Sequence, residues 1–161
     1  MTNETLTSEL LMEKLKEFEG CRLEAYQDVA GVWTIGYGHT KDVMQGDKIS
    51  QWWAEEELRW DIAIAERQVL ALKVCKTQGQ LDALVSFVFN LGIGQLKTST
   101  LLKKVRCKKC RPKDIRNEFL RWVYGGGEKL PGLVWRRKWE AQRFFDETPT
   151  LASVIEVRGK R

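Results

Sequence analysis

The sequence feature that most constrains the fold is the glycine-rich stretch from Glu19 to Thr40, which lies between two strongly helical regions. Valine, tryptophan, threonine, isoleucine and tyrosine dominate residues 29–37, with glycines between them, which predicts short antiparallel strands joined by glycine turns. Before this stretch, apolar residues recur at helical spacing. They predict a helix that begins at Thr7 or Ser8, where the hydroxyl caps it, and ends near Glu19. The expected fold class is therefore α+β and mostly helical, with a small antiparallel sheet.

Helical spacing continues after the sheet region. A long helix is expected from Ile49 or Ser50 to about Leu72. Its predicted buried face consists of Trp53, Leu58, Ile62, Ala65 and Val69. Further helices are expected over residues 77–92 and 101–105, from Pro112 onward, and from Pro131 to Phe145.

The length of 161 residues and the 43% hydrophobic content allow one domain with a substantial core. We expect this domain, residues 1–161, to be bilobed. Its predicted parts are an N-terminal lobe at about 1–60, a bridging helix at about 50–72, a helical C-terminal lobe at about 73–147 and a loosely attached tail at 148–161. A helix that bridges two lobes leaves a cleft between them, whereas an ordinary amphipathic helix in the same place needs no cleft.

Two carboxyl groups in the glycine-rich stretch have unlike predicted settings. Glu19 lies at the C-terminal end of a helix, where the helix dipole and the unpaired carbonyl groups disfavour a negative charge. Asp28 is expected at the start of the first strand, where a turn carboxylate can accept backbone N–H bonds and stay ionised. Glycoside hydrolysis requires one neutral and one charged carboxyl group. Acids at helix ends and in turns are also common without any chemistry, so the spacing alone leaves a structural role open.

A longer pattern around these acids resembles a known family. Glu19, Asp28 and Thr34 follow the spacing Glu-x8-Asp-x5-Thr within Glu-Gly…Tyr-x-Asp…Gly-x-Trp-Thr-Ile-Gly-Tyr-Gly-His-Thr. This pattern is similar to the catalytic region of the phage-type lysozymes, or endolysins, which form glycoside hydrolase family 24. The resemblance implies a lysozyme-like bilobed fold with the sheet in the N-terminal lobe. It also implies a muramidase that hydrolyses the β-1,4 bond between N-acetylmuramic acid and N-acetylglucosamine in bacterial peptidoglycan, for host-cell lysis.

The same resemblance implies a role for each of the three residues. Glu19 would be the general acid, Asp28 the carboxylate that orients the attacking water, and Thr34 a hydroxyl that places this water from the opposite side. The family inverts the anomeric centre. We therefore expect the two carboxyl groups to lie about 6.5–9.5 Å apart, rather than the roughly 5 Å typical of a covalent mechanism.

The second half of the chain carries further parts of the resemblance. The segments Phe87-Val-Phe-Asn-Leu-Gly-Ile-Gly and Thr98-Ser-Thr-Leu-Leu are similar to the family. They imply that Phe89 and Thr100 contact the glycan from the second lobe, opposite Thr40. Phe89 fits equally well as an aromatic residue of the core.

Four residues are expected to support the site. The family pairs the position of His39 with that of Asp61, and we interpret this pair as a structural contact between the sheet and the long helix rather than as catalytic. The motif Gly-Leu-x-x-Arg-Arg implies that Arg136 or Arg137 reaches Glu19, and the sequence does not choose between them. A nearby cation favours the carboxylate, which opposes the effect of the helix end.

The chain has four cysteines, Cys21, Cys75, Cys107 and Cys110. In a reducing compartment they are expected to be thiols rather than bridges. Cys107-Lys-Lys-Cys110 has the spacing of half a zinc site, but the sequence has no second pair and its only histidine is distant. We therefore expect no metal site and no cofactor.

Charge favours anionic partners. The chain has 27 basic and 22 acidic residues, a net charge of +5, and many of its cations lie in the second half. A basic surface attracts nucleic acid, anionic lipid headgroups and acidic wall polymers alike. One alternative function is therefore a catalytically inert module that binds cell wall or other polyanions. Another is a nucleic-acid binder, but no aromatic-rich basic groove supports it, so we expect no nucleic-acid partner.

The start of the sequence has neither the basic segment nor the apolar run of a signal peptide, and no later segment is long and apolar enough to span a bilayer. We expect synthesis in the host bacterial cytoplasm, a monomer and no stable membrane insertion. The resemblance implies that a phage-encoded pore, a holin, releases the protein to the wall in the periplasm.

Overall fold

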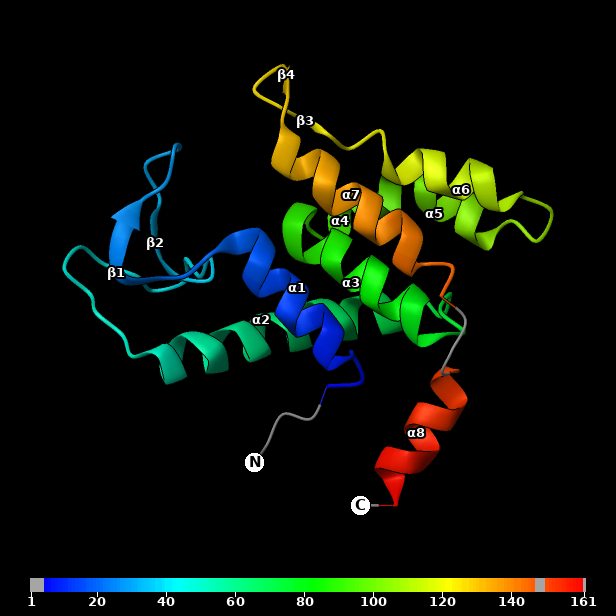
Figure 1. The fold of residues 1–161 in the computed structure, drawn as a ribbon, viewed down its shortest axis with the longest axis horizontal. Coiled ribbons are helices and arrows are strands. Elements are labelled where there is room, and N and C mark those ends of the chain that lie inside the picture. Colours follow the sequence, from blue (N-terminus) through cyan, green and yellow to red (C-terminus); the bar gives the residue numbers. More distant parts are fainter. Residues whose placement is uncertain (1–4, 147–149, 161) are drawn as a thin grey trace.

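The computed structural model describes residues 5–146 and 150–160, which are mostly helical, with a small antiparallel sheet at one end (Figure 1). In chain order the elements are α1 (Glu9–Glu19), β1 (Arg22–Gln27), β2 (Trp33–Gly36), α2 (Gln51–Leu70), α3 (Gln78–Leu91), α4 (Ile93–Thr98), α5 (Thr100–Arg106), α6 (Pro112–Phe119), β3 (Tyr124–Gly125), β4 (Glu128–Lys129), α7 (Pro131–Arg143) and α8 (Leu151–Gly159). This architecture confirms the predicted α+β class.

The first helix forms as predicted. The Ser8 hydroxyl accepts a hydrogen bond from the backbone N–H of Leu11 and caps the N-terminus of α1. Gly20 ends the helix with a φ of 66°, a conformation that favours glycine. Glu19 is therefore the last helical residue, at the end of the helix that faces the sheet (Figure 1).

The strands differ from the prediction. β1 and β2 pair antiparallel, with Tyr26 opposite Thr34. β1 precedes Asp28, so the prediction that Asp28 opens the first strand is wrong; this residue lies in the turn between the strands. Val29 is fully exposed in that turn and Asp28 binds the backbone of Ala30 and Val32, which closes the turn instead of extending a strand.

Helix α2 runs along one side of the molecule and contacts β2 as well as α3 (Figure 1). Ser50 caps it, as predicted. The predicted buried face is wrong at Trp53, which is 50% exposed, because its neighbour Ala54 is 0% exposed and faces the interior. Only a small side chain fits there: a Cβ placed on Gly36 would lie 3.4 Å from the Cβ of Ala54. The sheet thus packs closely on the first turn of α2.

Helix α3 lies at the centre of the core. Every residue from Gln78 to Val88 except Gln80 is buried, and α3 contacts α1, α2, α4 and α7. Two of these buried residues bind α7. Asp82 accepts hydrogen bonds from Arg143, and the Ser86 hydroxyl donates to Glu140. The buried side chains of Asp82 and Ser86 on α3 are therefore satisfied by hydrogen bonds to α7.

Three parts of the C-terminal half were not predicted. α4 is a separate short helix, and the glycine run 125–127 belongs to the β3–β4 hairpin rather than to a simple break: Gly125 ends β3, and Gly126 and Gly127 form the turn. Residues 148–161 were expected to be a loosely attached tail; residues 148, 149 and 161 lie outside the described residues, and Leu151–Gly159 form α8. This helix begins at a buried Leu151, whose N–H donates to the carbonyl of Lys76.

All four cysteines are free thiols. Within the described part of the chain, no helix has both the length and the apolarity needed to cross a membrane.

Candidate active site

Glu19 pairs with an arginine from the other end of the chain. Its Oε1 lies 2.5 Å from a terminal nitrogen of Arg136, on α7. The Glu19 side chain is 23% exposed, whereas that of Arg136 is 4% exposed. The structure therefore chooses Arg136 over Arg137 as the cation that reaches Glu19. One oxygen of the carboxyl group is held, and the group still has access to solvent.

Arg136 is held in turn by buried groups. Its other terminal nitrogen donates to the carbonyl oxygen of Ser86 at 2.9 Å, and its Nε lies 3.4 Å from Oε1 of Glu140. The Ser86 hydroxyl donates to the same Glu140 oxygen at 2.6 Å. The Glu140 side chain is 0% exposed. The guanidinium group that meets Glu19 is thus fixed by α3 and α7 together.

Arg137 has a different position. It points into the core, where it donates to the Glu140 carboxylate, to the side-chain oxygen of Asn90 and, at 3.2 Å, to the carbonyl of Trp122. Burial lowers the pKa of its guanidinium group, and the attraction of Glu140 acts in the opposite direction. Consecutive residues of a helix point in different directions. Arg136 therefore reaches the carboxyl group of Glu19, while Arg137 points into the core.

Gly38 faces the second oxygen of Glu19. A Cβ placed on this glycine would lie 3.6 Å from Oε2, and its φ of 91° is one that side chains rarely adopt. Glu19 therefore lies between α7 on one side and the turn after β2 on the other. Sequence reasoning did not single out Gly38, although its place beside His39 in the glycine-rich stretch was a signal.

The side chains of Asp28 and Thr34 both bind the backbone of Val32, which lies between them in the sequence. Oδ1 of Asp28 accepts hydrogen bonds from the N–H groups of Ala30 at 2.8 Å and Val32 at 2.9 Å, as expected for a turn carboxylate. The hydroxyl of the buried Thr34 donates to the Val32 carbonyl at 3.0 Å. Within residues 5–146 and 150–160, Oδ2 of Asp28 receives no hydrogen bond. One oxygen of the carboxylate is anchored and the other is available.

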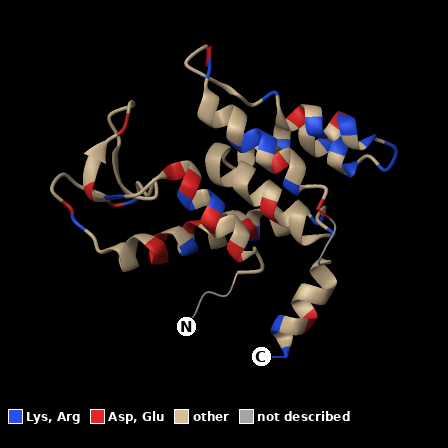
Figure 2. Cartoon of the chain, in the orientation of Figure 1, with Lys and Arg blue, Asp and Glu red and all other residues tan. Residues whose placement is uncertain are grey.

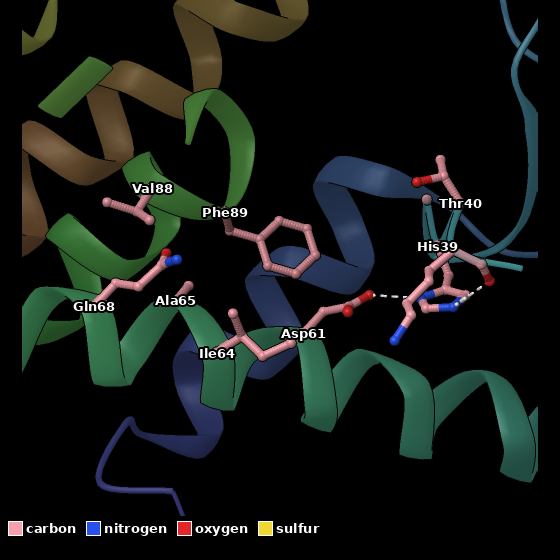
Figure 3. Close-up of a pocket in the computed structure, with 10 residues that line it drawn as sticks. His39, Thr40, Asp61, Ile64, Ala65, Gln68, Val88 and Phe89 are labelled. Carbon is pink, nitrogen blue, oxygen red and sulfur yellow. Dashed lines mark hydrogen bonds and ion pairs between the residues drawn. The ribbon is translucent and has the colours of Figure 1, made fainter. Parts of the chain in front are cut away.

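A cavity of about 270 Å³ opens beside Gly38 (Figure 3). The turn after β2 forms one wall, α2 forms another, and α3 contributes the third. Thr40 and Phe89 line it from opposite sides, as the sequence implied (Figure 3). Thr100 is exposed and lines a different cavity with Trp122. The structure thus brings Thr40 and Phe89 together and leaves Thr100 apart from them.

His39 and Asp61 meet on the wall of this cavity. Nδ1 of the histidine lies 3.0 Å from Oδ2 of Asp61, which confirms the predicted contact between the turn after β2 and α2. Its Nε2 lies 3.1 Å from the carbonyl oxygen of Lys41 and 3.5 Å from Oε2 of Glu57. Both ring nitrogens therefore have protein partners, which fixes the orientation of the ring.

Glu140 and Ser86 are functional neighbours that sequence reasoning missed. The signal for Glu140 was its spacing of three and four residues from the two arginines on one helix, which favours ion pairs. Ser86 gave no signal, because a serine within an apolar helix has many possible roles.

Comparisons with known proteins place the chain among phage lysozymes and endolysins. The sequence pattern of the phage lysozyme family matches residues 16–140. The endolysin of Acyrthosiphon pisum secondary endosymbiont phage 1 is 46% identical over 139 residues, which cover 81% of this chain and 91% of that protein. The endolysin of Bacillus phage B103 is 43% identical over 135 residues, but these span only 51% of its length. A crystal structure of P22 lysozyme, 32% identical, superposes with a TM-score of 0.76 over 89% of this chain and 100% of that one.

Proposed function

Because this chain belongs to the phage lysozyme family, we propose that Glu19, Asp28 and Thr34 carry out its reaction. The protein has the lysozyme-like fold and is an endolysin, a glycoside hydrolase of the muramidase type. Its substrate is peptidoglycan. We propose that the bond cleaved is the β-1,4 link between N-acetylmuramic acid and N-acetylglucosamine, and that cleavage inverts the anomeric centre.

Glu19 is the proton donor in this proposal. The observation that carries it is the contact of its Oε1 with the buried Arg136, which leaves Oε2 facing Gly38 at the edge of the cavity. Oε2 gives its proton to the glycosidic oxygen while the bond from this oxygen to the anomeric carbon breaks. Arg136 then faces the carboxylate that remains and stabilises its new charge.

Asp28 and Thr34 prepare the water. The two backbone N–H bonds to Oδ1 of Asp28 favour its ionised form and fix its direction. Oδ2 accepts a proton from the water as the water oxygen attacks the anomeric carbon from the face opposite the leaving group. The Thr34 hydroxyl already donates to the Val32 carbonyl, so its oxygen acts as a hydrogen-bond acceptor for the same water. Inversion requires a gap of about 6.5–9.5 Å between the Glu19 and Asp28 carboxyl groups.

The cavity between Thr40 and Phe89 is the proposed sugar site next to this chemistry. The Thr40 hydroxyl hydrogen-bonds the sugar and the Phe89 ring covers one apolar face. Thr100 lines a separate cavity, together with Trp122. His39 and Asp61 hold the cavity wall. In this arrangement α2 bridges an N-terminal lobe that carries Asp28 and a C-terminal lobe that carries Arg136.

The route to the wall is also a proposal. The family's substrate lies outside the cytoplasmic membrane, so the protein is made in the host cytoplasm and released to the periplasm through a holin pore. We propose that it works there as a monomer.

The experiment compares the wild type with Glu19→Gln and, as a matched control on the same helix, Glu17→Gln. Turbidity of outer-membrane-permeabilised cells, reducing sugar and the anomeric proton signals of fresh products are measured together. Wild type and Glu17→Gln should clear the cells and release α-anomers first. Glu19→Gln should lose activity by roughly 10²–10⁴-fold, because no proton donor remains.

Three results would contradict the proposal. Equal clearing by Glu19→Gln removes Glu19 as the acid. β-anomers as first products exclude inversion. Binding to wall fragments without release of reducing sugar, by the wild type, favours the inert wall-binding alternative.

A further inference from the structure

The Cys107-Lys-Lys-Cys110 segment forms a tight turn between α5 and α6. The N–H of Cys110 donates to the carbonyl of Cys107 at 3.2 Å, so the first and fourth residues of the turn are joined. Such a turn brings its outer Cα atoms within about 7 Å, close to the range that a disulfide spans. The backbone thus already brings the two cysteines close together.

The two thiols differ in a way that sets their order of reaction. Cys107 is exposed, whereas Cys110 is half-buried against the core. A hydrogen bond from the Cys110 thiol, helped by the backbone N–H groups of Lys109 and Cys110, lowers the pKa of Cys107. The same hydrogen bond raises the pKa of Cys110. Because it is exposed, Cys107 is the thiol that a reagent reaches first, and the half-buried Cys110 follows.

The other two cysteines have no such environment. Burial raises the pKa of Cys75 to about 12 and also raises the pKa of Cys21. Neither has a second cysteine nearby in the sequence. They remain protonated at neutral pH and serve as internal controls.

Cations surround the turn. Figure 2 shows basic residues gathered on α5, α6 and the loop that joins them. They are Lys103, Lys104, Arg106, Lys108, Lys109, Arg111, Lys113 and Arg116. Of these, Lys104 pairs with Glu118 and Arg111 with Asp114, so the net charge of the region stays strongly positive. An anionic reagent is attracted to this loop, and the attraction is screened by salt.

We propose that Cys107 and Cys110 form a thiol–disulfide exchange site for small anionic disulfides such as glutathione disulfide. The Cys107 thiolate attacks one sulfur of the reagent, forms a mixed disulfide and releases one glutathione thiolate. Cys110 loses its proton and attacks the Cys107 sulfur, which closes the Cys107–Cys110 bond and releases the second glutathione. Two protein thiols and one disulfide become one protein disulfide and two free thiols, so electrons and protons balance.

The reaction would fasten the end of α5 to the start of α6. The site lies at the opposite end of the molecule from β1 and β2 (Figure 1), so it is separate from Glu19 and does not depend on the roles assigned there. The ring is open in a reducing compartment and closes outside it.

The first test follows the products by mass. The reduced full-length protein is treated with glutathione disulfide, quenched in acid, alkylated and digested. The wild type, and a Cys21→Ser, Cys75→Ser double variant, should lose two hydrogen atoms across Cys107 and Cys110. Cys110→Ser should instead keep one glutathionyl group on Cys107, because the second thiol is missing. Cys107→Ser should react about tenfold more slowly, since only the half-buried Cys110 thiol remains.

The test also has results that overturn the proposal. If the wild type keeps both thiols open to alkylation, or if Cys110→Ser traps no glutathione on Cys107, the exchange site does not exist. A neutral disulfide, 2-hydroxyethyl disulfide, should react more slowly than glutathione disulfide at low salt, with the difference shrinking as salt rises. If the two disulfides reacted at equal rates at low salt, the site would have no preference for anionic reagents, and that part of the proposal would be wrong.

A second readout uses trypsin, which cleaves after Lys108 and Lys109 inside the proposed ring. Oxidation should slow cleavage there in the wild type and leave it unchanged in a Cys107→Ser, Cys110→Ser double variant. Equal cleavage of oxidised and reduced wild type would show that the bond does not fasten the loop.

Discussion

The two carboxyl groups of the site are held by contrasting kinds of structure. Glu19 depends on buried charges: Arg136 is 4% exposed, and Glu140 behind it is 0% exposed. Asp28 depends on two N–H groups of its own turn, next to a fully exposed Val29. The position of Glu19 therefore depends on the packed helices α3 and α7, whereas that of Asp28 depends only on a short hairpin. Removing a buried partner of the Glu19 site should cost stability, whereas replacing Asp28 should mainly cost turnover.

Removing the buried anion should have the largest effect on stability. Glu140→Ala leaves the buried Arg137 without a carboxylate partner and Arg136 with Glu19 alone, so we expect the free energy of unfolding to fall by about 3–5 kcal/mol. Urea unfolding measures this change in the free energy of unfolding. Glu17→Ala, at an exposed position on α1, is the control and should change stability by less than about 1 kcal/mol. If Glu140→Ala lowered the free energy of unfolding as little as the control, the buried charges would not be what holds Glu19, and its contrast with Asp28 would be lost.

Adding a methyl group beside Glu19 should have the next largest effect. Gly38→Ala forces a side chain into a φ of 91° and places it against Oε2 of Glu19, so it should cost about 1–2 kcal/mol and also lower turnover. Gly46→Ala is the matched control, because its φ is 88° and nothing lies within 4 Å. Thermal unfolding and wall-clearing rates are compared. If both variants retain full turnover, the Gly38 contact does not position Glu19.

The hairpin carboxylate should matter more for rate than for folding. Asp28→Ala removes two exposed turn hydrogen bonds, for about 1 kcal/mol of stability. It should lower the rate by roughly 10²–10⁴-fold if this carboxylate takes the water's proton. Asp47→Ala removes a comparable bond to the N–H of Met44 and should spare the rate. Equal rates for both variants would sharply weaken the assignment of Asp28.

The contact between His39, in the turn after β2, and Asp61 on α2 should have the smallest effect. His39→Asn loses the bond between the imidazole and Asp61, and we expect a loss of about 0.5–1 kcal/mol with turnover per folded molecule largely kept. Activity is normalised to the folded fraction measured by circular dichroism. Complete loss of turnover with unchanged stability would make His39 a participant in the chemistry instead.

Much of this architecture was predictable because its signals are local. Ser8 and Ser50 cap their helices, and Gly20 ends α1, as short-range rules indicate. The hydrogen bonding of the Asp28 side chain also followed from its turn.

The outcomes that the sequence did not predict have one local cause and several causes in distant contacts. Val29 has a strong strand preference, but the Asp28 turn overrides it. Trp53 and Ala54 are adjacent on one helix, and the close approach of Gly36 selects the smaller one for the interior. The choice of Arg136 over Arg137 depends on how α7 is rotated against α3, which no local pattern records. The separation of Thr100 from Thr40 has the same origin in tertiary packing.

The ion pair between Glu19 and Arg136 joins residues 117 positions apart. An unfinished polypeptide that stops before α7 has the carboxyl group but not its guanidinium partner. A truncation before α7 should therefore abolish wall clearing even though the sequence from Glu19 to Thr40 is complete.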